Sequence, residues 1–343
     1  MLPQSANLEP VTVNVDVCRN LATILRSRAI PQDHEDSSLP GFTALDIANF
    51  YLLLVAISHQ TSPQGQEPLE GTVGGFHRRG WDYLSAKLEA AVRVESRILS
   101  PVFWAQITSE EVKSLFRDEL LGDRLSDPEG RAELIRDLGR QMLRHSWKSA
   151  EEIYRASDGY IGGADAGLLS LLAEFRAYSD PVRKKSFFFL ALMRNAGVWS
   201  YKDPSNLGAP IDYHEIRGHL RIGTVQIRDP ELHTKLIQGR TVTADQDIAI
   251  RRAVHKALMF VSEFSGLRNP SQIHYLFWNV FRSCCTRDNP HCHACPPSCT
   301  LPARYVPLAL FPDGTRRCPF SNICQSAARE PKLLEPRIET DYY

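Results

Sequence analysis

The cysteines are the residues of this chain whose spacing most clearly indicates chemistry. Seven of the eight cysteines lie within residues 284–324, and the eighth lies near the N-terminus. Six residues separate Cys285 from Cys292, and five separate Cys318 from Cys324. Four thiolates from closely spaced loops can surround an iron–sulfur cube or hold one zinc ion, and the spacing does not choose between them. A disulfide framework fits less well, because such frameworks belong to short secreted chains.

A second group of polar residues follows Pro210, in the run Ile211-Asp-Tyr-His-Glu-Ile-Arg217. Asp212 stands where a helix would begin, so its carboxylate can cap that helix. A carboxylate can also perform acid–base catalysis or stabilise a developing positive charge. The residues alone leave both roles open.

The cysteine pattern resembles the [4Fe–4S] loop of the helix-hairpin-helix DNA glycosylase superfamily, in particular that of endonuclease III and the adenine-mismatch glycosylases. In that family the last two cysteines flank a Pro-apolar pair and lead into a short helix. Here the ending reads Cys318-Pro-Phe-Ser-Asn-Ile-Cys324. The upstream line from Tyr275 to Cys285 is similar to the helix that delivers the family's first cysteine.

The resemblance implies a [4Fe–4S] cluster held by Cys285, Cys292, Cys318 and Cys324. This chain departs from the family by an insertion, which follows either Cys292 or Cys295. In the second case Cys295 takes the place of Cys318 as the third ligand, while Cys284 and Cys299 are spare. We expect the cluster to be structural or to position DNA, since hydrolysis needs no redox step.

The Asp212 segment resembles the superfamily's stretch around its essential aspartate, V-D-x-H-x-x-R-x-x-x-R-x-G. Asp212 takes the aspartate position and His214 the histidine, while Arg217 and Arg221 take the arginines. The resemblance implies that Asp212 is the catalytic carboxylate, because breaking an N-glycosidic bond builds positive charge on the sugar. The same group can activate a water. We expect His214 and Arg217 to contact DNA.

Two further positions are candidates for contact with the target base. The run from Leu54 to Thr61 resembles the helix end where the family carries a glutamine that probes the DNA around an extruded base, which makes Gln60 the candidate. Trp81 follows a Gly-rich loop and could stack on a flipped base. The alternatives are a polar residue that ends a buried helix, and a tryptophan that packs in the core.

The hairpin is the clearest departure from the family. The superfamily carries L-P-G-x-G upstream of its aspartate, where glycine amides grip a phosphate, whereas this chain reads Tyr178-Ser-Asp-Pro-Val-Arg-Lys184-Lys185. Lys185 or Lys184 could supply the amine of a bifunctional glycosylase, or the pair could begin a solvated helix. We expect a monofunctional enzyme, because the usual glycine context is missing. Queuosine-nucleotide salvage glycosylases have a comparably degenerate hairpin on a related fold.

The segments that must position these residues are predicted to be almost entirely helical. Apolar residues recur at helical spacing in residues 44–58, 81–92, 109–121, 132–146, 167–178, 183–196 and 245–264. Breaks are predicted at residues 62–75 and 203–210, and a loop at 296–315 lies within the cysteine group. No β–α alternation is present, so the predicted fold class is all-α.

Composition and charge limit the classes of protein to which this chain can belong. A hydrophobic content of 43% in 343 residues allows a sizeable core. Lys plus Arg equals Asp plus Glu at 40 each, so the net charge lends no support to nucleic-acid binding. No apolar run approaches the roughly 20 residues of a membrane-spanning helix, and residues 1–16 lack a secretory pattern. We expect a cytoplasmic, nucleoid-associated monomer.

The resemblance implies a two-domain helical architecture. Helices in residues 1–44 would pack on the cluster domain, 45–200 would form a six-helix barrel, and 205–343 would carry the catalytic aspartate and the cluster. Asp212 would face the cleft between the domains, into which the target base is flipped. The expected activity is excision of a modified or damaged base from DNA. The rivals are a salvage N-glycosidase acting on a free modified nucleoside or nucleotide, and a non-enzymatic zinc-bound DNA- or protein-interaction module.

Overall fold

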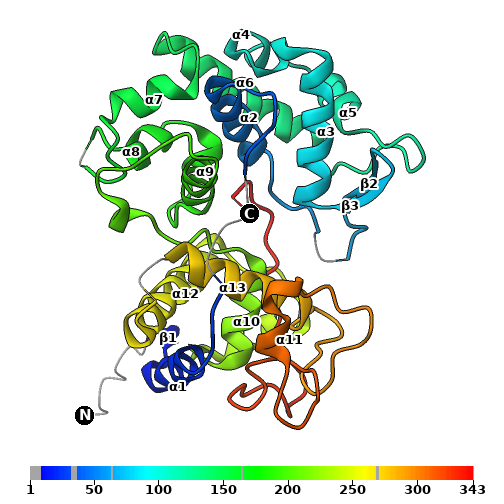
Figure 1. Cartoon of the computed structure of the whole chain (residues 1–343), viewed down its shortest axis with the longest axis vertical. Helices are drawn as coiled ribbons and strands as arrows, with labels where there is room; N and C mark the ends of the chain where they lie inside the picture. The colour runs from blue at the N-terminus through cyan, green and yellow to red at the C-terminus, as the bar shows by residue number, and fades with distance from the viewer. Residues whose placement is uncertain (1–8, 32–36, 63–64, 164, 268–269, 343) are drawn as a thin grey trace, which may run out of the picture. The chain divides into compact units, whose positions relative to one another are not determined.

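The computed structural model describes residues 9–31, 37–62, 65–163, 165–267 and 270–342. The chain divides into two compact units, of which unit 1 joins residues 1–33 to 211–339 and unit 2 joins 34–210 to 340–343. Helices dominate both units (Figure 1), as the sequence predicted. Within the described residues, no helix combines the length and the apolar character needed to cross a membrane.

Unit 1 contains the Asp212 segment and all eight cysteines. Its elements are β1 (Val11–Val13), α1 (Val15–Arg26), α10 (Tyr213–Ile222), β4 (Val225–Ile227), α11 (Pro230–Gln238), α12 (Ala244–Ser265), α13 (Pro270–Ser283), the 3-10 turn η4 (Ala303–Tyr305) and α14 (Val306–Ala309). α1 packs along α12, and β1 pairs antiparallel with β4 (Figure 1). The N-terminal segment therefore folds with the C-terminal part of the chain.

α10 has a clear beginning and end in the sequence. The Asp212 side chain accepts hydrogen bonds from the first amides of the helix, as a capping residue does. The helix ends at Gly223, whose φ of +94° lies in the left-handed region. A Cβ atom at Gly223 would lie only 2.3 Å from the side chain of Gln325, so this position requires glycine for space as well as for conformation.

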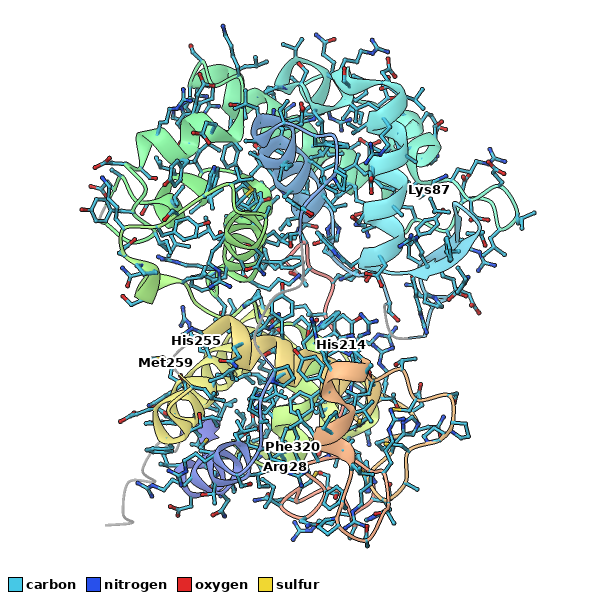
Figure 2. All side chains as sticks on the ribbon, viewed as in Figure 1. Arg28, Lys87, His214, His255, Met259 and Phe320 are labelled. Atoms are coloured by element: carbon cyan, nitrogen blue, oxygen red, sulfur yellow. The ribbon has the colours of Figure 1, made fainter. Side chains whose placement is uncertain are left out.

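α10 crosses α13 closely, and an aromatic group seals the crossing. A Cβ atom at Gly218 would lie 2.3 Å from the ring of Phe281, so only glycine allows this approach. Phe281 stacks on Phe277, and Phe320, which is labelled in Figure 2, packs against both rings. Because Phe320 lies between Cys318 and Cys324, this apolar contact anchors the cysteine segment to α13.

Unit 2 is built around α2 (Ala44–Ala56), which is buried along almost its whole length. The other elements are β2 (Glu70–Val73), β3 (Phe76–Arg79), α3 (Trp81–Val94), η1 (Ser96–Leu99), α4 (Pro101–Trp104), α5 (Ser109–Phe116), α6 (Pro128–Arg144), α7 (Ala150–Ala156), α8 (Leu168–Leu172), η2 (Arg176–Tyr178), α9 (Lys184–Asn195) and η3 (Pro204–Asn206). Asn49 on α2 donates to the Leu99 carbonyl and accepts from the Ala150 amide, so one buried side chain joins three elements.

The structure corrects the sequence predictions in several places. The all-α class omitted two short antiparallel pairs, β1 with β4 and β2 with β3. The first joins distant segments, and the second turns at Gly74 and Gly75, both with positive φ. The helix predicted at 109–121 ends at Phe116, because the Asp118 carboxylate accepts from two amides in a following turn. The helix predicted at 167–178 is divided into α8 and η2.

Burial of a histidine at the α10–α13 crossing makes stability depend on pH. His219 is fully buried against Phe277 and Phe281, and its Nδ1 lies 2.7 Å from the Thr224 hydroxyl. Burial lowers the pKa of His219 to about 3. Below about pH 6.5 the unfolded chain therefore binds a proton that the folded chain does not. The folded state loses stability as the pH falls through this window.

We predict that His219 makes the free energy of unfolding fall by about 1.4 kcal/mol per pH unit between about pH 6 and pH 4. His219→Gln should remove that part of the slope in urea denaturation measured at several pH values. The exposed His233, changed to Gln as a control, should leave the slope as in the wild type. Equal slopes in the wild type and His219→Gln would show that His219 is not buried neutral.

Candidate functional site

The Asp212 carboxylate is held in place by three N–H donors. Its Oδ1 accepts from the backbone amides of His214 at 2.8 Å and Glu215 at 3.3 Å. Its Oδ2 accepts from the indole Nε1 of Trp278 on α13 at 2.9 Å. The guanidinium of Arg282 lies over the Trp278 ring, 4.5 Å from its centroid. Asp212 is half-buried, so a fixed carboxylate remains accessible at the start of α10.

A buried ion pair behind Asp212 joins α10 to α13. The Nδ1 atom of His274 lies 2.8 Å from Oε2 of Glu215, and both side chains are almost completely buried. Burial raises the pKa of Glu215, and the nearby His274 opposes that rise. Because Trp278 lies one helical turn after His274 on the same helix, this pair fixes the position of the indole that Asp212 accepts from.

Arg217 is a buried structural residue in this fold. Its Nη1 forms an ion pair with Glu335 at 2.9 Å, its Nε donates to the Cys285 carbonyl at 2.7 Å, and its Nη2 lies 2.9 Å from His214 Nδ1. The predicted contact of Arg217 with DNA does not fit this structure, because the side chain is only 1% exposed and these three bonds occupy it. Its position instead supports a role in holding the polypeptide at Cys285.

His214 keeps part of its ring accessible. The arginine partner can only donate, so Nδ1 of His214 accepts and the ring proton lies on Nε2. His214 lies on α10 in the first turn after Asp212, and its side chain is half-buried (Figure 2). The predicted contact with a nucleic acid stays a prediction for this residue.

Arg221 holds the segment that follows Cys285. Its guanidinium donates to the carbonyls of Thr286 at 2.7 Å, Arg287 at 2.8 Å and Leu333 at 2.8 Å. It also lies 3.5 Å from the Cys285 sulfur. The two arginines matched to the family pattern thus bind α10 to the start of the cysteine segment.

The four cysteines favoured by the sequence analysis are neighbours in the fold. Burial raises the pKa of Cys318 well above its usual range, and the thiols of Cys285, Cys324 and Cys292 raise it further. Burial raises the pKa of Cys324 to about 11. Cys285 and Cys318 are buried, whereas Cys292 and Cys324 are half-buried. We call these four residues the quartet.

The structure brings together three other cysteines, which we call the triad. The sulfur atoms of Cys284, Cys295 and Cys299 all lie within 4.8 Å of one another, close enough to hold a metal ion. The sequence predicts Cys295 only as a substitute ligand of the cluster, with Cys284 and Cys299 spare. Only the folding of the loop over the end of α13 reveals the grouping.

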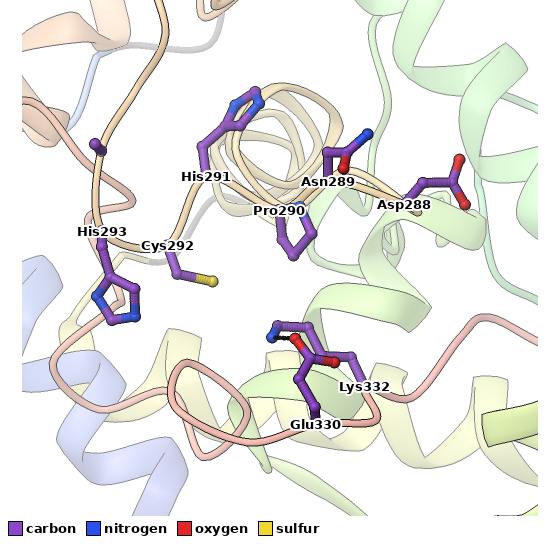
Figure 3. A pocket seen from close by; sticks show the side chains of 9 residues that line it. Asp288, Asn289, Pro290, His291, Cys292, His293, Glu330 and Lys332 are labelled. Atoms are coloured by element: carbon purple, nitrogen blue, oxygen red, sulfur yellow. Dashed lines mark hydrogen bonds and ion pairs between the residues drawn. The ribbon is translucent and has the colours of Figure 1, made fainter.

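An open pocket of about 420 Å³ borders the quartet at Cys292 (Figure 3). It is lined by residues 288–294 together with Glu330 and Lys332, which form an ion pair. The Cys292 side chain points toward that ion pair in Figure 3. This side of the quartet is open, whereas Cys285 and Cys318 face the interior.

Lys185 lies in unit 2 and is fully buried. Its ammonium group donates to the carbonyl of Ala56 at 2.5 Å and lies 3.5 Å from Nδ1 of His59. Burial lowers its pKa well below the usual range, and the positive charges of Lys184 and Arg131 lower it further. A lowered pKa suits an amine nucleophile, but the side chain occupies the end of α2 rather than a solvent-facing surface.

The other two predicted base contacts also lie in unit 2. Trp81 packs against Phe188 with the ring centroids 4.7 Å apart, and it is half-buried. Gln60 has a φ of +46°, and its backbone carbonyl accepts from the Ser126 hydroxyl at 3.4 Å. Packing of Trp81 matches the structural alternative, and the proposed roles in base recognition stay predictions.

A carboxylate of the chain itself accepts hydrogen bonds from the backbone amides of the degenerate hairpin. Asp180 is buried, and it accepts from the amides of Val182 at 3.0 Å and Lys184 at 2.9 Å. These amides open α9, where a phosphate would otherwise find N–H donors. The missing glycines are visible in the sequence, and so is the signal for this internal anion, because Asp before Pro at a helix start is a recognisable capping pattern.

No protein-family model matches the chain, and no curated protein matches it. The resemblance to the helix-hairpin-helix glycosylases therefore rests on the residues described above.

The Arg217–Glu335 pair gives a stability prediction that separates a structural role from DNA contact. Arg217→Leu should lower the free energy of unfolding by about 3 kcal/mol, at the low end for breaking a buried pair, because Glu335 then keeps only its ion pair with the less buried Arg287. Urea denaturation measures the effect, and the exposed Arg240→Leu should stay within about 0.5 kcal/mol of the wild type. The double variant with Glu335→Leu should recover part of the loss. A mild effect at Arg217 would contradict the structural role.

Proposed function

We propose that the protein is an N-glycosidase that removes a modified base from DNA, with Asp212 as its catalytic carboxylate. The observation that carries the proposal is the arrangement of α10. This helix begins at a half-buried aspartate held by three N–H donors, and its two arginines hold the segment that supplies the first quartet cysteine. The two parts of the sequence that resemble the glycosylases therefore belong to one packed structure.

The geometry of Asp212 suits the chemistry of glycosidic cleavage. As the bond between C1′ and the base nitrogen breaks, its electron pair leaves with the base and positive charge builds on the sugar. A carboxylate beside the sugar stabilises that charge. It can also take the proton of the attacking water as the new C1′–O bond forms. The amides and Trp278 hold the carboxylate so that little reorganisation is needed during the reaction.

The quartet fits an iron–sulfur cluster by the chemistry of its donors. Four thiols come from neighbouring points of the loop, and two of them lie in the protein interior. Thiolates are the ligands of such clusters. We assign Cys285, Cys292, Cys318 and Cys324 as the residues that would hold a [4Fe–4S] cluster. When bound, the cluster would fix this loop against α10 and supply no step of the hydrolysis.

The environment of Lys185 favours base release without strand cleavage. A Schiff base would require the amine to reach the C1′ carbon of an abasic sugar. Lys185 is instead fully buried and donates to the end of α2. We therefore propose a monofunctional enzyme.

The Asp180 hairpin favours a second candidate function. Its carboxylate already occupies amides that would grip a DNA phosphate, and the net charge of the chain is zero. Both features suit a salvage enzyme that acts on a free modified nucleoside or nucleotide. Affinity for duplex DNA that falls steeply with salt would favour DNA, because such dependence reports the release of counterions from phosphates.

Asp212→Asn should depress base release by about 10²–10³ through loss of the charge, and by roughly another 10² through loss of water activation. The fold should survive, because the cost of one disturbed bond to Trp278 is about 1 kcal/mol. Turnover should be measured on a panel of oligonucleotides that carry modified bases and on free modified nucleosides and nucleotides.

Asp245 provides the matched control for this experiment. It is an exposed carboxylate in the first turn of α12, and Asp245→Asn should keep full activity. Trp278→Phe keeps the Asp212 charge but removes one donor, so it should cost far less than Asp212→Asn. Wild-type turnover in Asp212→Asn on whichever substrate is active would refute the assignment.

The quartet predicts that protein purified without oxygen contains about four irons and four sulfides per chain. Cys285→Ser or Cys324→Ser should lose most of this iron and reduce the yield of folded protein, because cluster binding and folding are coupled. Metal analysis and visible absorbance measure the loss. Cys18→Ala, a buried cysteine of α1 outside both groups, should retain the iron. Wild-type protein without iron would reject the cluster.

A further inference from the structure

The triad has the geometry of a site for one metal ion. Its three sulfur atoms lie within 4.8 Å of one another. In a tetrahedral zinc site, Zn–S bonds of about 2.3 Å place thiolate sulfurs roughly 3.8 Å apart. Movements of roughly half an ångström by each sulfur would close the difference. Ligands of a [4Fe–4S] cube bind separate irons and must stand farther apart, so the triad suits a single ion.

Rigid backbone positions hold the three cysteines. The Cys284 amide donates to the Val280 carbonyl at 2.7 Å, which places this residue at the end of α13. The Cys295 amide donates to the Arg316 carbonyl at 2.7 Å, and the Cys299 amide donates to the Pro296 carbonyl at 3.0 Å. The three sulfurs therefore come from a helix end and a tight loop.

The triad is a neighbour of the quartet but is not part of it. None of the four quartet cysteines has its sulfur within 4.8 Å of all three triad sulfurs. Cys284 and Cys285 are adjacent in the chain, yet one contributes to the triad and the other to the quartet. A single cofactor would not require this division of seven cysteines into two groups.

We propose that Cys284, Cys295 and Cys299 bind one zinc ion, separate from the iron–sulfur cluster. Zinc accepts thiolate ligands in tetrahedral geometry. Among the residues that the structure describes, no fourth Cys, His, Asp or Glu joins the three within 4.8 Å. We assign the fourth coordination position to a water molecule.

The zinc ion would join the end of α13 to the insertion that distinguishes this chain from the glycosylases it resembles. The chain runs from Cys295 through η4 and α14 to Cys318. The backbone carbonyl of Arg316, near the end of this segment, accepts a hydrogen bond from the Cys295 amide. A zinc ion at Cys295 would hold the two ends of this segment together, and so would keep Cys318 in place for the quartet. The proposal rests on the proposed function only in assigning the quartet to the cluster.

The test compares zinc and iron in the same preparations of the full chain. The wild type, purified without oxygen and without added chelator, should contain about one zinc beside its iron. Cys299→Ser should lose the zinc and keep the iron, whereas Cys324→Ser should lose the iron and keep the zinc. Cys299→His supplies another zinc ligand and should retain the metal. Cys18→Ala should retain both metals.

A second measurement keeps the proposal open to refutation if Cys299→Ser does not fold. Treating the wild type with a chelator should expose the three triad thiols to alkylation, and peptide mapping should identify them. Wild-type protein with full iron and no zinc would overturn the proposal. So would loss of iron together with zinc in a folded Cys299→Ser variant, because the triad would then serve the cluster. Zinc without iron would keep the triad site and reject the cluster.

Discussion

The buried arginines of α10 are the constraint on which the candidate site depends. Arg217 donates to the carbonyl of Cys285, Arg221 donates to that of Thr286, and Arg217 forms an ion pair with Glu335. Burying a guanidinium costs several kcal/mol unless it is paired, and the fold meets this need for Arg217 with Glu335 and for Arg221 with backbone carbonyls. Asp212 begins the same helix. A shift of α10 would therefore move the Asp212 carboxylate together with the start of the cysteine segment and the segment around Glu335.

The same physical problem is solved differently in unit 2. The last carbonyls of α2 have no partners within their own helix. Arg131 donates to the carbonyls of Ile57 and His59, and Lys185 donates to that of Ala56. Burial lowers the pKa of Arg131 to about 10, and it also lowers the pKa of His59 well below its usual value. These N–H donors satisfy the carbonyls at the end of α2, which explains a buried lysine without assigning it to catalysis.

The two cysteine groups lie at different places in one loop. The quartet lies against α10 through Cys285, whose sulfur is 3.5 Å from Arg221. The triad lies at the end of α13 and at the base of the insertion. Thiols packed this closely in the interior disfavour one another's ionisation, and bound metal ions would reverse that effect. Metal binding would therefore overcome the repulsion between thiolates and become the main source of order in a segment with few helices.

The sequence by itself determined the mostly helical fold and offered capping of α10 as one of two roles for Asp212, because helical periodicity and capping are local properties. It also predicted a metal site in the cysteine segment, since the spacing of the thiols can be read directly from the sequence. It could not show that Arg217 is buried against Glu335, that Asp180 fills the hairpin amides, or that Cys284, Cys295 and Cys299 converge. Those facts depend on contacts between residues far apart in the chain or on how a loop folds, and only tertiary packing decides which polar groups lose their water and must find one another.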